Sequence, residues 1–372
     1  MTAALALPGQ PVALVDTPAL VIDLDAMERN LERMAGFARA HGMRLRPHAK
    51  THKCAAIAKL QIERGAVGVC VQKVAEAEAL AACGVPDIYI SNEVVDPAKL
   101  QRVAELARTL RLAIAVDSAL GVERLAVALK AAGSSVAVFV EIDVGHGRCG
   151  VAPVAAGALA HQVVSNGLAF AGLQAYHGRA QHLRGAAERE AAIRHAVRLA
   201  RAAQASISAA GIDCPLVTGA GTGTFVHEAA SGLYGELQAG SYLFMDRDYA
   251  DNEAASAAPR FEHALFVKSQ VMSRGYAHAV VDAGHKSHAV DSGLPRVWQR
   301  DLEFVNGGDE HGILRPHADP KALPDLGETV WLVPGHCDPT VNLHDRYVAV
   351  RGGLQQGRVE AVWTIDARGC LS

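Results

Sequence analysis

The sequence predicts an α/β protein in which a (β/α)8 barrel is joined to a mostly antiparallel β domain. Between residues 24 and 248, short apolar runs suited to buried parallel strands alternate with amphipathic segments rich in Ala, Leu, Arg and Glu. After Asp248 the helical pattern fades, and short runs of alternating apolar and polar residues follow. We therefore expect residues 24–248 to form the barrel, and residues 1–23 with 249–372 to form the β domain.

The barrel prediction rests on eight strand candidates, the number that closes such a barrel. They are Arg44–Arg46, Val67–Val71, Ile88–Ser91, Leu112–Val116, Val136–Ile142, Phe170–Ala175, Pro215–Val217 and Glu236–Ala239. A polar or glycine-rich group follows almost every one of them. In a barrel these positions share the C-terminal rim, where such enzymes build their sites. One such group is an ordinary loop start, but eight together indicate an active site.

The flanking elements follow from similar patterns. Asp25, with Glu28 three residues later, is typical of a helix start, and the apolar spacing then runs to Gly42. In the β domain we expect Thr17–Asp23 to accompany five later strands. These are Ala264–Met272, Ala279–Asp282, Thr329–Val333, Tyr347–Arg351 and Val359–Ile365.

Composition excludes several classes of protein. The net charge of −3 and the pI near 6.6 argue against binding of nucleic acid or of an anionic membrane surface. No stretch reaches the roughly 18 apolar residues that a membrane helix needs. The seven cysteines are odd in number and lack CxxC spacing, so we expect reduced thiols in a cytoplasmic protein.

A basic stretch, Arg46-Pro-His-Ala-Lys-Thr-His-Lys53, follows the first barrel strand. Repulsion between like charges is expected to lower the pKa of a lysine there, and a lysine that loses its proton can form a Schiff base. Lys50 is therefore the candidate for covalent attachment of a carbonyl compound. The alternative is a basic surface loop.

A glycine-rich stretch, Thr218-Gly-Ala-Gly-Thr-Gly-Thr224, follows the seventh strand. Small residues let several backbone N–H groups point at one anion, and Ser241 with Tyr242 after the eighth strand should complete a phosphate site. A Schiff-base lysine and a phosphate site together fit pyridoxal 5'-phosphate (PLP). Arg148 would then face the pyridine nitrogen, unless it forms a salt bridge with Glu141 or Asp143.

These motifs together resemble the D-threonine aldolase and D-serine dehydratase family, which has the alanine-racemase type of fold. The resemblance runs in order through Thr17-Pro18, the Lys50 stretch, Gln72-Lys-Val74, Asn92-Glu-Val94, Asp143–Gly150, Gln174–Gly178, the glycine-rich loop, Gln238–Tyr242 and Pro334–Thr340. It implies a homodimer that acts on D-configured amino acids. It also implies this cofactor-binding set: Lys50, Gln72, Arg148, Tyr176, Thr218, Gly219, Gly221, Thr222, Gly223, Ser241 and Tyr242.

His336 and Asp338 are the predicted metal ligands. Two residues apart on an extended loop, they can point the same way and offer one nitrogen and one oxygen to a divalent cation. In the serine dehydratases of this family the second ligand is a cysteine, which suits zinc. An aspartate at that position resembles the aldolases and favours Mn²⁺ or Mg²⁺. Zn²⁺ stays an alternative, because a bulged backbone could bring Cys337 into the site.

Four further histidines are candidates. His182 matches the histidine that such aldolases place near the substrate hydroxyl, and its ordinary pKa suits proton transfer at neutral pH. His311 lies on a β-domain loop and could border the metal site. His48 and His177, which follow the first and sixth strands, are possible substrate neighbours.

The resemblance implies a metal-dependent PLP aldolase that cleaves D-β-hydroxy-α-amino acids, D-threonine for example, into glycine and an aldehyde. The alternatives are a 3-hydroxy-D-aspartate aldolase, which would release glyoxylate, and a dehydratase of D-serine or D-3-hydroxyaspartate, which would release ammonia and a keto acid. A PLP carrier is the alternative without catalysis. The side chain of the substrate, its diastereomer, the metal, and the subunit that supplies the metal loop stay open.

Overall fold

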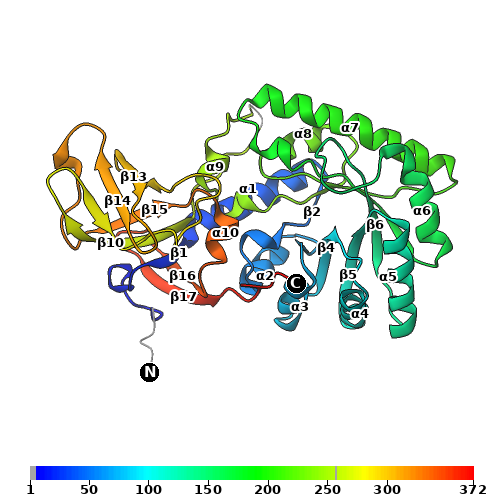
Figure 1. The fold of residues 1–372 in the computed structure, drawn as a ribbon, viewed down its shortest axis with the longest axis horizontal. Helices are drawn as coiled ribbons and strands as arrows, with labels where there is room; N and C mark the ends of the chain where they lie inside the picture. Colours follow the sequence, from blue (N-terminus) through cyan, green and yellow to red (C-terminus); the bar gives the residue numbers. More distant parts are fainter. Residues whose placement is uncertain (1–5, 256–257) are drawn as a thin grey trace.

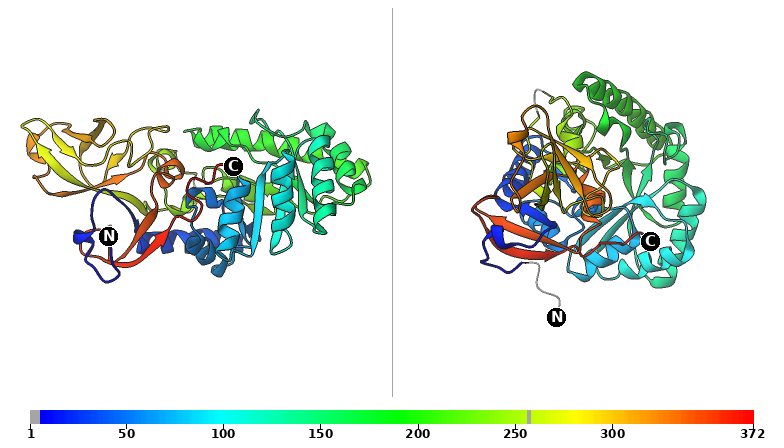
Figure 2. Two further views of the ribbon diagram at one scale, coloured as in Figure 1. Left: turned by 60° about the horizontal axis from the view of Figure 1, so that its bottom comes forward. Right: turned by 60° about the vertical axis from the view of Figure 1, so that its left-hand side comes forward.

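The computed structural model describes residues 6–255 and 258–372, and two parts can be distinguished in it (Figure 1). A parallel barrel with helices around it occupies one end, and a mostly antiparallel β structure occupies the other. The left view of Figure 2 shows the same side-by-side arrangement, and its right view looks from the side of the β part. The segment from Asp251 to Arg260, which is rich in Ala and ends in Pro-Arg, is expected from its composition to be the connecting loop between the two parts. Residues 256 and 257 of it lie outside the described residues.

The barrel sheet has eight parallel strands in the order β2-β9-β8-β7-β6-β5-β4-β3. Their bounds are β2 (Arg44–Leu45), β3 (Val69–Val71), β4 (Asp87–Glu93), β5 (Arg111–Val116), β6 (Ala137–Glu141), β7 (Ala169–Gln174), β8 (Val217–Gly219) and β9 (Glu236–Leu237). A parallel bridge between His48 and Cys70, with a 2.9 Å hydrogen bond from Val67 N–H to Leu45 O, joins the two ends. The (β/α)8 prediction is confirmed, and β8 begins two residues later than predicted.

Helices follow the strands and cover the outside of the barrel (Figure 1). They are α1 (Leu24–Ala40), α2 (Ala55–Glu63), α3 (Val74–Ala82), α4 (Pro97–Leu106), α5 (Ala119–Ala132), α6 (Ala156–Ser165), α7 (Ala186–Ala209) and α8 (Phe225–Ala230). Short helical segments lie at the rim and in the β part: η1 (Val12–Leu14), η2 (Ala49–Thr51), η3 (Pro153–Ala155), η4 (Arg179–His182), η5 (Ser241–Leu243), α9 (Arg247–Ala250), η6 (Pro320–Ala322) and α10 (Cys337–Val341).

The second sheet is built around β1 (Ala19–Asp23), which pairs antiparallel with β10 (Leu265–Arg274) and parallel with β16 (Arg346–Arg351). The segment before α1 is therefore part of this sheet. The other strands are β11 (Ala279–Val281), β12 (Arg296–Val297), β13 (Leu302–Asn306), β14 (Gly312–Pro316), β15 (Thr329–Val333) and β17 (Arg358–Thr364). All five later runs expected from the sequence form strands. The sequence analysis missed β12 to β14.

Helix α1 connects the two parts. Its buried residues, among them Met27 and Leu31, share one hydrophobic core with Leu237 of the barrel and Val267 of β10. The helix start differs from the prediction, because the Asp23 side chain accepts a 3.1 Å hydrogen bond from Ala26 N–H and caps the helix.

Asp25 and Glu28 have another role. Both carboxylates accept hydrogen bonds from the Arg351 guanidinium of β16, at 2.9 Å and 2.7 Å. The residues that looked like a capping pair therefore tie α1 to the second sheet.

Two absences concern the whole described chain. No helix within residues 6–255 and 258–372 is long and apolar enough to cross a membrane. All seven cysteines lie in these ranges and none forms a disulfide, in agreement with the reduced thiols expected from the sequence.

The cap on α1 gives a first prediction. Replacing Asp23 by Ala leaves the Ala26 N–H without its acceptor, and we expect a loss of about 1 kcal/mol in the free energy of unfolding. In a chain of this size that loss lowers the melting temperature by about 2 °C, which thermal unfolding can measure. Asp23→Asn keeps an oxygen at the cap and should stay near the wild-type value. Equal losses in both variants would contradict the capping role.

Candidate active site

Most of the predicted site residues meet in one cavity of about 360 Å³ at the C-terminal rim of the barrel. Those that line it are His48, Lys50, Gln72, Arg148, Tyr176, His182, Gly221, Thr222, Ser241, His336 and Asp338. The last two come from the loop after β15 in the same chain. The second sheet therefore contributes to the rim of its own barrel.

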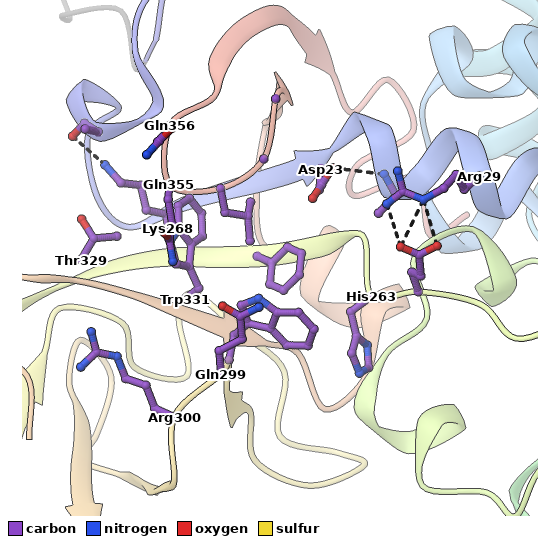
Figure 3. Close-up of a pocket in the computed structure, with 18 of the residues that line it drawn as sticks. Asp23, Arg29, His263, Lys268, Gln299, Arg300, Thr329, Trp331, Gln355 and Gln356 are labelled. Atoms are coloured by element: carbon purple, nitrogen blue, oxygen red, sulfur yellow. Dashed lines mark hydrogen bonds and ion pairs between the residues drawn. The ribbon is translucent and has the colours of Figure 1, made fainter. Parts of the chain in front are cut away.

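A larger hollow of about 1250 Å³ lies outside this rim, among β10, β15 and the 352–356 loop (Figure 3). Its cations already have partners. The Lys268 amine donates to the carbonyl oxygens of Ala13 and Val15, and Arg29 binds the Glu262 carboxylate at 2.7 Å. None of the residues predicted for chemistry lines it, so the smaller cavity is the candidate active site.

Lys50 lies on η2, directly after β2, and its Nζ is 3.4 Å from Asp338 Oδ2. Burial would lower the pKa of Lys50, but the Asp338 carboxylate outweighs it and the pKa is raised. The predicted lowering by neighbouring cations is therefore wrong for this arrangement. The Arg148 charge does lower the Lys50 pKa, but the sequence could not show that Asp338, from a distant loop, lies next to Lys50.

The loop that carries the two predicted metal ligands, His336 and Asp338, is called the metal loop below, and it departs from the predicted extended form. His336 is extended and precedes α10, whereas Asp338 lies in the first turn of that helix. Both side chains still line the cavity. Cys337 is fully buried in the hydrophobic core, so its thiol points away from the cavity.

Two acids orient this loop. The His336 Nδ1–H donates to Asp291 Oδ2 at 2.7 Å, which leaves Nε2 as the nitrogen that can bind a metal. Asp246 accepts 2.9 Å and 3.0 Å hydrogen bonds from the backbone N–H groups of Cys337 and Tyr249. The loop and helix α9 are thereby held together.

The donor set fits a divalent cation with open positions. Asp338 Oδ1 is buried and has no hydrogen-bond partner within residues 6–255 and 258–372. One free carboxylate oxygen and one imidazole nitrogen are a possible pair of ligands. No cluster of three or more His, Cys, Asp or Glu suited to a metal occurs in that part of the chain.

The glycine-rich loop has the features of an anion site. Ala220 adopts a left-handed conformation with φ of 70°. In the part of the chain that the structure describes, the N–H groups of Gly221, Thr222 and Gly240 have no protein acceptor. Successive free N–H groups at such a turn can bind a phosphate.

The remaining predicted loop residues support this turn. The Tyr242 N–H donates to Thr222 Oγ1 at 2.9 Å, and the Gly223 N–H donates to Gln181 Oε1 at 3.0 Å. A Cβ on Gly219 would lie 2.7 Å from Ala175 O, so only glycine fits there. The buried Thr218 hydroxyl donates to Glu236 at 2.9 Å, away from the cavity.

Arg148 carries a charge without a carboxylate within 4 Å in the described chain, so the alternative of a salt bridge is not realised. Asp143 instead accepts from the N–H groups of Gly145 and Gly147. Burial, reinforced by Glu93, raises the pKa of Glu141 well above its ordinary value. The Arg148 guanidinium lies 5.9 Å from the centre of the Tyr176 ring and is free to bind a ligand.

His182 forms a pair with a buried acid that the sequence analysis missed. Its Nδ1–H donates to Asp248 Oδ2 at 2.6 Å, and Arg184 binds the other oxygen of the same carboxylate. Burial would raise the pKa of Asp248, but these hydrogen bonds lower it to about 2. The ionised carboxylate holds the proton of His182 on Nδ1, so Nε2 can accept one.

The other candidate histidines differ in position. His48 lines the cavity, and burial, with the Lys50 charge, holds its pKa well below the ordinary value, so it is neutral. His177 is buried behind the rim, where its Nδ1 accepts from Ala180 N–H at 3.4 Å. His311 is exposed between β13 and β14 and does not line this cavity.

Among the cavity residues that the sequence analysis did not assign to the site are His146, Arg179, Gln238 and Tyr249. His146 and Arg179 stand in the same motifs as Arg148 and His182, so proximity in sequence was an available signal. Tyr249 follows Asp248, at the point where the pattern of the chain changes.

A parallel barrel whose rim joins a lysine, an anion-binding glycine loop and an unpaired arginine defines the PLP-dependent enzymes of alanine-racemase type. The family model "Alanine racemase, N-terminal domain" matches residues 22–248, and "Putative serine dehydratase domain" matches residues 264–350. The chain belongs to the family of D-threonine aldolases and D-serine dehydratases, with an alanine racemase N-terminal domain as its barrel.

Three relatives show how far the similarity extends. D-threonine aldolase of Arthrobacter sp is 47% identical, over 97% of this chain and 95% of that protein. 3-Hydroxy-D-aspartate aldolase of Paracoccus denitrificans (strain Pd 1222) is 44% identical, over 98% and 95%. The crystal structure of D-threonine aldolase from Filomicrobium marinum superposes with a TM-score of 0.96 at 48% identity, over 99% of this chain and 100% of that one.

A dehydratase is more distant. D-threo-3-hydroxyaspartate dehydratase of Delftia sp. (strain HT23) is 33% identical, over 88% of this chain and 92% of that protein. Two variants of a D-threo-3-hydroxyaspartate dehydratase have solved structures. One replaces a histidine by alanine, and the other, in a metal-free form, replaces a cysteine two residues later by alanine. Their TM-scores are 0.85 and 0.83, at 27% and 28% identity over at least 95% of both chains.

The position of Lys50 leads to a prediction about the cofactor. We expect borohydride reduction of the PLP-loaded protein to add the mass of the cofactor to wild type but not to Lys50→Ala. Among residues 6–255 and 258–372, Lys50 is the one lysine that lines the cavity. Lys59→Ala, which removes an exposed amine on α2, is the matched control and should label like wild type. Labelling of Lys50→Ala at another lysine would contradict the assignment.

The Asp248 pair predicts a pH-dependent contribution to stability. Its pKa of about 2 lies below the ordinary 3.8, so the stabilisation is complete above about pH 5 and is lost as the pH falls towards 2. A shift of this size corresponds to about 2 kcal/mol. The difference in unfolding free energy between wild type and Asp248→Asn should therefore shrink between pH 5 and pH 3. A difference that does not change with pH would contradict it.

Proposed function

We propose that this protein is a PLP- and divalent-cation-dependent aldolase that cleaves D-β-hydroxy-α-amino acids into glycine and an aldehyde. The single observation that carries the proposal is the meeting of Lys50, the His336–Asp338 pair and His182, which is hydrogen-bonded to Asp248, in one cavity. The aldolases of Arthrobacter and Paracoccus, each similar over nearly the whole chain, support the same reaction class.

The cofactor fits the residues present. Lys50 would bind PLP covalently, the N–H groups of Gly221 and Thr222 would bind the phosphate, and Arg148 would face the ring nitrogen. PLP, when bound, accepts the electrons of the Cα–Cβ bond as it breaks. An arginine at the ring nitrogen cannot give up its proton, so Arg148 would keep this nitrogen neutral.

His336 and Asp338 would hold the cation. The free Asp338 oxygen and the orientation of His336 by Asp291 support this assignment. The spacing also equals that of the histidine and cysteine replaced in the dehydratase variants. A divalent cation there supplies a Lewis acid for the substrate hydroxyl. Because the second ligand is a carboxylate, Mn²⁺ or Mg²⁺ is favoured, with Zn²⁺ as the alternative.

His182 would take the proton of the β-hydroxyl group. Its Nδ1 proton is bound to Asp248, so the lone pair of Nε2 is the one available for this transfer. The hydrogen bond to Asp248 opposes a flip of the imidazole ring, so Nδ1 and Nε2 keep their positions. Asp248 acts in this scheme as a positioning residue.

The dehydratase is the second candidate, favoured by the serine dehydratase domain match. The dehydratases of the family have a cysteine at the position of Asp338. The aspartate in this chain supports the aldolase instead. We further propose a cytoplasmic homodimer, in keeping with the free thiols and the resemblance to the family. A carrier without catalysis has no use for the His336–Asp338 pair.

The proposal is tested by incubating the protein with PLP and Mn²⁺, and with D-threonine, D-3-hydroxyaspartate or D-serine in separate reactions. We expect glycine and aldehyde in equal amounts, loss of the reaction with EDTA, and recovery with added Mn²⁺. Ammonia and keto acid without glycine would overturn the aldolase in favour of the dehydratase. Bound PLP without any turnover would favour the carrier.

A single variant tests the metal ligand in the same assay. Asp338→Asn should lower kcat/KM by at least about 100-fold and weaken Mn²⁺ binding, because an amide is a poorer ligand than a carboxylate. Asp345→Asn changes an exposed carboxylate that pairs with Arg368 and is the matched control. Unchanged Mn²⁺ binding in Asp338→Asn would exclude Asp338 as a ligand.

A further inference from the structure

Arg179 is a cation of the cavity that the proposed reaction does not use. It begins η4, the short helix that ends with His182, and both side chains line the cavity. Only three Lys or Arg side chains line it in the described chain: Lys50, Arg148 and Arg179. Lys50 faces Asp338 and Arg148 is assigned to the cofactor ring, so Arg179 is left for another ligand.

The helix that carries Arg179 is held in place by Gln181, which is fully buried. The Gln181 side chain donates to Thr224 Oγ1 at 2.8 Å and accepts from Gly223 N–H at 3.0 Å. Its backbone carbonyl accepts from Asn252 Nδ2 at 2.9 Å. Because Gln181 is hydrogen-bonded to the glycine-rich loop, η4 keeps its place relative to the cofactor site.

The spacing within η4 places Arg179 beside the group that would act on the β-hydroxyl. In a 3-10 helix the side chains of residues three apart lie on the same edge, as Arg179 and His182 do. The β-carbon of a β-hydroxy amino acid carries both the hydroxyl and the side-chain substituent. A cation next to His182 is therefore close to that substituent.

Arg179 has no ion-pair partner among the residues that the structure describes. No carboxylate lies within 4 Å of it in residues 6–255 and 258–372, whereas Arg184, five residues later, binds Asp248. Burial, with the charges of Arg148, His177 and Arg179, lowers the pKa of His146 on the same wall. The Asp143 carboxylate opposes this shift, but its Oδ1 accepts from the Gly145 and Gly147 N–H groups and it does not pair with Arg179. The Arg179 guanidinium therefore stays available to an anionic ligand.

From this arrangement we propose that Arg179 binds a carboxylate on the β-carbon of the substrate. The site then prefers β-hydroxy-D-amino acids with an anionic side chain, of the 3-hydroxy-D-aspartate type, over D-threonine. The inference rests on the proposed aldolase function, since it uses the position of His182 next to the β-hydroxyl. Arginine suits the role because its planar guanidinium can bind a carboxylate through two hydrogen bonds.

The test compares two substrates in Arg179→Met, which keeps the length of the side chain but removes its charge. For D-3-hydroxyaspartate we expect kcat/KM to fall at least about tenfold, the effect of losing one charge-assisted hydrogen bond. For D-threonine it should stay within about twofold of wild type. Arg179→Lys should recover part of the loss. Arg194→Met, which removes an exposed charge on α7, is the matched control.

A second measurement does not depend on turnover. D-Aspartate and D-2-aminobutyrate lack the β-hydroxyl, so they cannot be cleaved, and their binding can be followed by the absorbance of bound PLP. Wild type should bind D-aspartate at least about tenfold more tightly, and Arg179→Met should lose this preference.

The outcomes separate the two proposals. Equal losses for both substrates in Arg179→Met would overturn the inference and assign Arg179 to the α-carboxylate. Unchanged kinetics for both would overturn it as well. A third outcome is that wild type cleaves neither substrate but binds D-aspartate preferentially, and that Arg179→Met lacks this preference. The aldolase function then fails while the anion site of Arg179 stands.

Discussion

The contact between Lys50 and Asp338 is the interaction on which the arrangement of the site depends. One residue follows the first strand of the barrel and the other lies on the loop after β15, nearly three hundred positions later in the sequence. Their side chains meet only because α1 and the core around it hold the second sheet against the rim of the barrel. Tyr347 strengthens this junction, since its hydroxyl donates to the His52 carbonyl at 2.7 Å.

Two buried polar residues keep the working side chains in place. Gln181 joins η4 to the glycine-rich loop, and Asp246 joins the metal loop to α9. Through η4 and α9 they position both partners of the His182–Asp248 pair. A buried polar group is costly unless its hydrogen bonds are made, so these two residues favour a single arrangement of the rim.

The choice between aldolase and dehydratase chemistry depends on the few atoms around the substrate hydroxyl. A carboxylate at position 338 offers an oxygen ligand, and the buried thiol of Cys337 cannot replace it without rebuilding α10. The ionised Asp248 fixes the tautomer of His182, so the imidazole can take a hydroxyl proton. Both features suit the removal of a proton from the hydroxyl more than its departure as hydroxide.

The sequence by itself determined the alternation of strands and helices, and with it the rim that gathers Lys50, Arg148, His182 and the glycine-rich loop. Local periodicity and turn chemistry suffice for this, because every parallel strand of a barrel delivers its C-terminal residue to the same rim. It did not reveal β12 to β14, or that Asp23 rather than Asp25 caps α1.

Only the tertiary structure decided the partners of these residues. The Lys50 pKa is raised by an acid from the segment after β15, His182 is oriented by Asp248, and no carboxylate of the described residues pairs with Arg179. Each of these depends on distances of a few ångströms between residues far apart in the chain. Electrostatic energies change steeply over such distances and local sequence patterns carry no record of them, so charge and orientation at the site follow from the fold.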